Sequence, residues 1–141
     1  MVCFSLNDCG GGVAGEAAFR TNLTQIAERI RQSAACILMT PNMMATYACA
    51  WADPNYKSSI PFFVGRQTDG TLGRYVDIIR DVARDTGTPL ADGYAEWMRR
   101  QEGGQDMTKL LINGLNHPNA EGHRILADVL LKSFEAGLAE A

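Results

Sequence analysis

Short apolar runs alternate with segments of helical period along this chain, and this alternation constrains the fold more than any other feature. The runs at 2–6, 35–40 and 89–92 have the length and composition of buried strands. Elsewhere apolar residues recur every three or four positions, which is typical of helices with one buried face. The order strand, helix, strand, long loop, helix, strand, helix, helix predicts an α/β fold with a parallel sheet.

The helices are expected from apolar spacing and from residues that cap helix ends. The first carries Phe19, Leu23, Ile26 and Ile30, and the second carries Leu72, Tyr75, Val76, Ile79 and Val82. Gly87 is the expected C-cap of the second, and a shorter helix is expected over 94–100. The last helix should begin after an N-cap at Asn119. Its predicted core face is Ile125, Leu126, Val129, Leu130 and Phe134.

The stretch 43–69 shows no clean period and is long for a loop in a compact domain. We therefore predict an active-site loop or lid that contains one helical turn. Its aromatic residues Trp51, Tyr56 and Phe62 either line an acyl or sugar pocket or pack within the lid itself.

The length of 141 residues predicts a single domain over 1–141. A net charge of −3 argues against nucleic acid or an anionic membrane as partner. No apolar run approaches the ~20 residues that span a bilayer. The first residues lack the basic region of a signal peptide, so we expect a cytoplasmic protein as encoded, although a segment ahead of Met1 could carry a signal.

The four cysteines form no C-x-x-C pair, which argues against a structural zinc site. Cys3 and Cys36 lie in apolar runs and are expected to be buried. His117, Glu121 and His123 could suggest a metal site, but local packing of His123 is the simpler interpretation. We expect neither a metal nor a cofactor.

Polar residues gather where predicted strands end, as Asn7-Asp8 and Pro41-Asn42 do. Chemistry in parallel sheets gathers at this carboxyl edge, and the turn with His117 before the last helix can reach it. A histidine exchanges protons near neutral pH and can act as a general base. The simpler alternative is that His117, Asn7 and Asp8 only shape turns.

Two motifs resemble one family, the SGNH (GDSL-type) hydrolases. Leu6-Asn7-Asp8 after the first strand resembles their G-x-N-D block, and Asn116-His117-Pro118-Asn119 with Glu121-Gly122-His123 resembles their histidine block. The resemblance implies a three-layer flavodoxin-like fold and a serine esterase or acylhydrolase. It assigns His117 as general base and Asn7 as a donor to the oxyanion. An Asn-His-Pro turn resembles carbohydrate or acetyl-ester esterases, so a small-molecule or carbohydrate ester is the expected substrate.

The chain departs from the family pattern in three places. The family's acid stands three residues before the histidine, which here is Gly114; Asn113 could instead orient the ring. Ser5 stands where the family often has glycine. The Gly-Asp-Ser block should precede the asparagine block, and it is not in this sequence. We therefore expect an N-terminally truncated domain that lacks its first strand and is inactive alone.

Other serines are weak replacements for the nucleophile. A strand serine such as Ser5 is more often packed than reactive, and no elbow motif surrounds Ser33, Ser58, Ser59 or Ser133. Two further functions stay open: a non-catalytic flavodoxin-like binding or interaction module, and a small complete enzyme that uses Ser5 or a metal. An exposed edge at 2–6 also predicts self-association.

Overall fold

The computed structural model describes residues 1–139, which form an α/β fold with a parallel sheet. The α-helices are α1 (Gly12–Arg31), α2 (Ile60–Thr68), α3 (Thr71–Thr86), α4 (Gly93–Glu102) and α5 (Ala120–Ala139). The strands are β1 (Leu38–Thr40) and β2 (Leu90–Asp92). Short 3-10 helices are η1 (Asp8–Gly11), η2 (Pro54–Ser59) and η3 (Met107–Leu110).

The sheet is built around β1. Leu38 pairs with Leu90 and Thr40 with Asp92, so β1 and β2 run parallel. On the other side of β1, the Val2 N–H donates to the Ile37 carbonyl (2.9 Å), and the Val2 carbonyl accepts the Met39 N–H (2.8 Å). The spatial order is therefore Val2, β1, β2, and the parallel direction of the strands confirms the predicted parallel sheet.

The predicted strand over 2–6 is wrong beyond Val2, which forms an isolated bridge. Ser5 has a φ of 112°, in the left-handed region, and its N–H donates to the Asp8 carboxylate (2.9 Å). The Cys9 N–H donates back to the Ser5 carbonyl (2.9 Å), which closes a turn. These local bonds lead the chain into η1, and they confirm Asp8 as a turn residue. Cys3 is exposed on this short edge, so its predicted burial is wrong.

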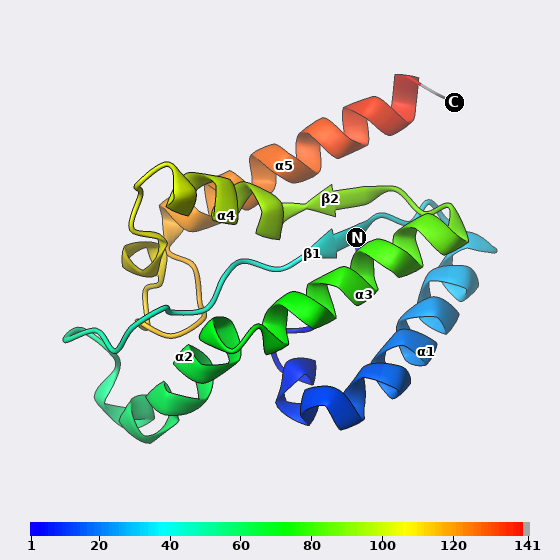
Figure 1. Cartoon of the computed structure of the whole chain (residues 1–141). Helices are drawn as coiled ribbons and strands as arrows, with labels where there is room; N and C mark the ends of the chain where they lie inside the picture. The colour runs from blue at the N-terminus through cyan, green and yellow to red at the C-terminus, as the bar shows by residue number, and fades with distance from the viewer. Residues whose placement is uncertain (140–141) are drawn as a thin grey trace.

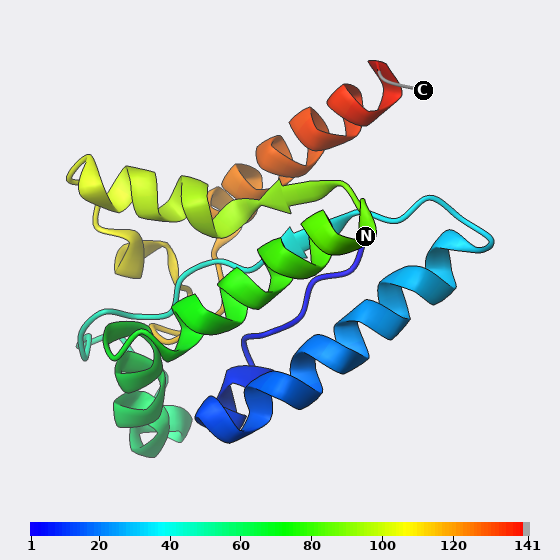
Figure 2. The same cartoon turned by 45° about the vertical axis from the view of Figure 1, so that its right-hand side comes forward.

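Helices cover both faces of the sheet and make three layers (Figures 1 and 2). α1 and α3 pack together on one face, and α4 and α5 pack together on the other. Tyr75 and Ile79 of α3 are buried against the α1 side, whereas Trp97 of α4 is buried on the opposite side. This arrangement leaves the carboxyl ends of the strands at one edge of the molecule.

Helix ends follow the residues that the sequence singled out. Gly87 has a φ of 61° after α3, and its N–H donates to the Ala83 and Arg84 carbonyls, which confirms the C-cap. The Asn119 side chain accepts the Gly122 N–H (2.9 Å) at the start of α5, which confirms the N-cap. Both caps satisfy backbone groups that a helix end leaves unpaired.

The stretch 43–69 holds more structure than the predicted single turn, because η2 and α2 both lie in it. Pro54 and Pro61 stand in the first turns of η2 and α2, where a missing N–H costs nothing. α2 has no fully buried residue. Its apolar residues Ile60, Phe63 and Val64 stand at helical spacing but are only partly buried, and Phe63 and Val64 pack against the core.

The far half of α5 leaves apolar surface open. Of its predicted core face only Ile125 is fully buried, and Phe134 is 50% exposed. An open apolar groove of about 610 Å³ lies between α5 and the amino ends of the strands. It is lined by Met1, Ala35, Cys36, Ile37, Pro89, Ala127, Leu130, Leu131, Ser133 and Phe134. Within residues 1–139, no helix combines the length and the apolar character that a membrane span requires.

Candidate active site

One pocket of about 400 Å³ brings together the three residues that the sequence singled out for chemistry, Asn7, Asn113 and His117. Its other lining residues are Asp53, Tyr56, Phe63, Ile112, Leu115 and Asn116. This volume falls within the ~300–1,000 Å³ common for small-molecule sites. The three candidates come from opposite ends of the chain, so only the fold joins them.

Asn7 lies between the Val2 bridge and η1 and is exposed. Its side chain makes no capping hydrogen bond, so its amide stays available to a ligand. Asn7 also lines an adjoining pocket of about 190 Å³ together with Ser5, Asp8 and Pro41. The two strand ends that the sequence placed at one edge therefore do meet there.

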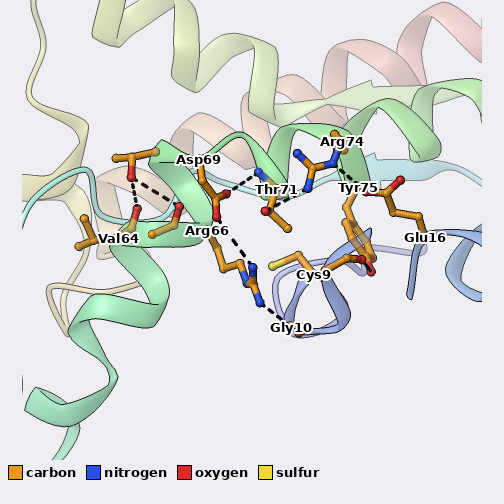
Figure 3. Close-up of polar contacts among 12 residues, drawn as sticks. Cys9, Gly10, Glu16, Val64, Arg66, Asp69, Thr71, Arg74 and Tyr75 are labelled. Carbon is orange, nitrogen blue, oxygen red and sulfur yellow. Dashed lines mark hydrogen bonds and ion pairs between the residues drawn. The ribbon is translucent and has the colours of Figure 1, made fainter. Parts of the chain in front are cut away.

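Side chains of α2 and α3 fix the segment that follows Asn7 (Figure 3). The Arg66 guanidinium donates to the Gly10 carbonyl (3.3 Å), and the Tyr75 hydroxyl donates to the Gly12 carbonyl (2.8 Å). Arg74 binds Glu16 of α1 at 2.7 Å. Four residues of α2, α3 and α1 thus hold the start of α1 in place, and with it the position of Asn7.

The turn that carries His117 is organised by Asn113. The Asn113 side-chain oxygen accepts the backbone N–H groups of Leu115, Asn116 and His117, each at 3.0 Å. The Asn113 amide donates to the Asn116 side-chain oxygen (3.0 Å). The Ile112 N–H donates to the His117 carbonyl (2.8 Å), which closes the turn. The backbone of His117 is therefore held on two sides while its side chain is exposed.

Asn113 holds the backbone of the turn, and its oxygen is fully committed to that task. Within residues 1–139, no side chain is hydrogen-bonded to the His117 imidazole. Asn113, which the sequence offered as a partner of the ring, makes no such bond. A role for Asn113 in orienting the ring stays a prediction. In the structure, Asn113 holds the main chain of the turn.

The opposite wall of the pocket is tied to this turn through Gly114. Gly114 has a φ of 67°, and a Cβ there would lie 2.9 Å from the Cα of Ala52. The Cys49 thiol donates to the Gly114 carbonyl (3.4 Å), and the Asp53 N–H donates to the Asn113 carbonyl (3.2 Å). A larger residue at 114 would push the two walls apart.

Of the aromatic residues considered for a pocket, Tyr56 lines it and Phe62 and Trp51 do not. Phe62 lies under the Arg66 guanidinium (5.3 Å to the ring centre), and Trp51 packs edge-on against Tyr47. Asn116 also lines the pocket, and it stands in the Asn116-His117-Pro118-Asn119 motif. The sequence did not single out the remaining lining residues Asp53, Phe63, Ile112 and Leu115. The Asp53-Pro54 pair, typical of a helix start, was the available signal for the first of these.

No serine among residues 1–139 lines the pocket with His117. Ser5 lies in the adjoining pocket and is 1% exposed. Its hydroxyl oxygen is buried and has no hydrogen-bond partner in the described part of the chain. A nucleophile and its base stand within hydrogen-bond reach in activated pairs, and Ser5 and His117 do not form that pair here.

Two titratable groups beyond the lining of the pocket, Cys9 and Asp92, have shifted pKa values with structural causes. Burial raises the pKa of the Cys9 thiol to about 11, and its sulfur donates to the Leu6 carbonyl (3.3 Å). At the end of β2, burial would raise the pKa of Asp92, but hydrogen bonds from Arg80 and Thr40 outweigh it and lower that pKa. Across residues 1–139, no three His, Cys, Asp or Glu side chains cluster as a metal site would need.

Residues 1–125 match the GDSL-like Lipase/Acylhydrolase family. No curated protein matches this chain significantly. Its structure is similar to a mutant of Axe2, an acetyl-xylooligosaccharide esterase from Geobacillus stearothermophilus, with a TM-score of 0.68 and 17% identity. It is also similar to LAE5, an α/β hydrolase from the metagenome of Lake Arreo in Spain, with a TM-score of 0.65 and 19% identity. Each match covers 93% of this chain and 56% of the other, and it shows a shared fold.

Proposed function

Since the chain belongs to the GDSL-like lipase/acylhydrolase family, we propose that the pocket around His117 serves the hydrolysis of a carboxylic ester by a serine nucleophile. One observation carries the proposal. Asn7 and His117, which the family resemblance singles out as oxyanion donor and base, line the same pocket although 110 positions separate them in sequence (117 − 7).

In the proposed reaction His117 accepts the proton of the serine hydroxyl as that oxygen attacks the ester carbonyl. The carbonyl oxygen becomes an oxyanion in the tetrahedral intermediate, and the free amide of Asn7 donates a hydrogen bond to it. Such a donor contributes about 3–4 kcal/mol to the barrier reduction. His117 then returns the proton to the leaving alcohol, and a second cycle with water releases the acid.

We propose further that these 141 residues do not turn over esters by themselves. No serine within residues 1–139 lines the pocket of His117, and the buried hydroxyl of Ser5 belongs to the adjoining pocket. The chain then supplies the base and one oxyanion donor, and the nucleophile must come from a segment outside these residues. The proposed substrate is a carbohydrate acetyl ester, which the acetyl-xylooligosaccharide esterase neighbour and the small pocket support.

The test measures p-nitrophenyl acetate hydrolysis and labelling by a fluorophosphonate. We expect neither from the chain alone. We expect both when a serine-bearing N-terminal segment of a GDSL-type esterase is joined ahead of Met1. In that fusion His117→Ala should abolish turnover and Asn7→Ala should reduce it about 100- to 1,000-fold. His123→Ala, which removes the other histidine, should have no effect.

Hydrolysis by the fusion that survives His117→Ala would refute the proposed base. Turnover by the chain alone would refute its inactivity, and labelling that disappears in Ser5→Ala would assign that activity to Ser5. A stable monomer that binds a specific ligand while every fusion stays inactive would favour the non-catalytic binding module instead.

We also propose self-association through the sheet edge at Val2, which pairs with β1 on one side and has no strand on its other side among residues 1–139. Unpaired edges favour pairing with another chain. A cytoplasmic location stays a prediction, which fractionation of the source cells would test.

A further inference from the structure

Building on that proposed function, we propose that Tyr56, Asp53 and Asn116 form the subsite that holds the sugar ring of the ester. All three line the pocket of His117, so a ligand on them lies beside the proposed chemistry. Together they offer a pyranose ring an aromatic platform, a hydrogen-bond acceptor and a hydrogen-bond donor.

Tyr56 supplies the platform. Tyr56 is 52% exposed although it lines a pocket, so a ligand can reach it. The Tyr56 N–H donates to the Asp53 carbonyl (2.9 Å), which ties Tyr56 to the residue that caps η2. An aromatic ring of this kind offers a large apolar area at little cost in side-chain entropy.

Asp53 supplies the acceptor. One of its carboxylate oxygens caps η2 by accepting the Asn55 N–H (2.9 Å). The other oxygen has no partner in the part of the chain that the structure describes. Because the Asp53 N–H is bound to the Asn113 carbonyl, this carboxylate is anchored to the histidine turn. It can accept a hydrogen bond from a sugar hydroxyl, which strengthens because the acceptor is charged.

Asn116 supplies the donor. Its residue is only 6% exposed, and its side-chain oxygen is occupied by the Asn113 amide. Its own amide donates to no group within residues 1–139. The amide nitrogen is not among the buried atoms that lack a partner in the described residues, so it stays accessible, and a ligand oxygen in the pocket can accept a hydrogen bond from it. A hydroxyl that donates to Asp53 and accepts from Asn116 uses both groups.

The test titrates the chain with acetylated xylotriose and follows amide chemical shifts by NMR. Shifts should concentrate at 53–63 and 113–117. Tyr56→Ala and Asp53→Asn should each raise the dissociation constant about tenfold. Stacking and a charged hydrogen bond each contribute a binding free energy that corresponds to a change of that size. Tyr56→Phe keeps the ring and should bind like the parent. Trp51→Leu removes an exposed aromatic residue outside the pocket and should also bind normally.

Asparagine caps a helix as well as aspartate, so Asp53→Asn should leave η2 intact, and unchanged circular dichroism checks this. Binding that is unchanged in both Tyr56→Ala and Asp53→Asn would overturn the subsite, as would the absence of any binding. The fusion assay uses p-nitrophenyl acetate, which has no sugar. A fusion that hydrolyses it while the chain binds no xylotriose would refute the subsite and leave the proposed function standing.

Discussion

Replacing Asn113 tests whether one side chain organises the turn of His117. In Asn113→Ala the N–H groups of Leu115, Asn116 and His117 lose their acceptor. Leu115 and Asn116 are buried, so their N–H groups stay unsatisfied at about 1 kcal/mol each, while that of the exposed His117 can bind water. The lost bond to the Asn116 side chain adds about 1 kcal/mol. We expect a total of about 3 kcal/mol.

Asn113→Asp is the matched control, because a carboxylate still accepts all three N–H groups and loses only the bond to Asn116. It should cost about 1 kcal/mol near neutral pH. Three N–H donors lower the pKa of a carboxylate, so this variant's stability should fall as the pH drops below about 3.9, the unfolded value.

The measurements are urea unfolding by circular dichroism and hydrogen exchange of the amides at 115–117. The alanine variant should show both a lower free energy of unfolding and faster exchange in the turn. Equal losses in the alanine and aspartate variants would show that the acceptor oxygen does not matter. A loss below about 0.5 kcal/mol in Asn113→Ala with unchanged exchange would refute the reasoning altogether.

Three further predictions concern packing, charge and thiols. Gly93→Ala should destabilise by about 1–3 kcal/mol, because a Cβ there would lie 3.0 Å from the backbone oxygen of Thr40, which cannot move aside, and 2.6 Å from the Leu126 side chain. Gly73→Ala, with open space around it, should stabilise by about 0.5–1 kcal/mol. A melting scan that ranks the two variants otherwise contradicts this packing. Hydrogen bonds, first from Arg99 and then from Arg100, lower the pKa of Glu96 to about 2, so Glu96→Gln should lower the melting temperature above pH 4.5 and the difference should vanish as the pH falls towards 2; a constant difference down to pH 2 would exclude this origin. The exposed Cys3 should react with a thiol reagent at pH 8 well before Cys9, whose pKa is about 11, and mass spectrometry that finds Cys9 modified first would contradict its burial.

The sequence predicts a helix well where the spacing of its apolar residues matches the face that the helix buries. Leu72, Ile79 and Val82 are all buried in α3, and that helix ends at Gly87 as predicted. The same rule fails for α2, which buries no residue fully. It also fails at 2–6, where Cys3 and Phe4 are exposed and local hydrogen bonds turn the chain at Ser5.

The residues of the site likewise fall into those that the sequence could identify and those that it could not. Asn7 and His117 stand in local motifs, so the sequence could single them out before the fold brought them together. Asp53 stands in no such motif, and Asn116 stands in the motif of His117 without a role assigned from it. The places of both depend on contacts with residues far away in sequence. The N–H of Asp53 reaches the Asn113 carbonyl, and the Asn116 carbonyl accepts the amide of Asn42 (2.9 Å). No local pattern contains contacts of that kind.

The two proposed catalytic groups are held by separate sets of contacts, and this separation shapes what substitutions can reveal. Asn7 depends on η1 and the side chains of α2 and α3, whereas His117 depends on Asn113 and the packing of Gly114 against Ala52. Arg66→Ala should therefore disturb the oxyanion donor and leave the histidine turn intact, since substitutions at distant sites act independently. Hydrogen exchange at 115–117 that stays unchanged in Arg66→Ala would show that Asn7 and His117 are held independently. Faster exchange there would show that the pocket is one cooperative unit.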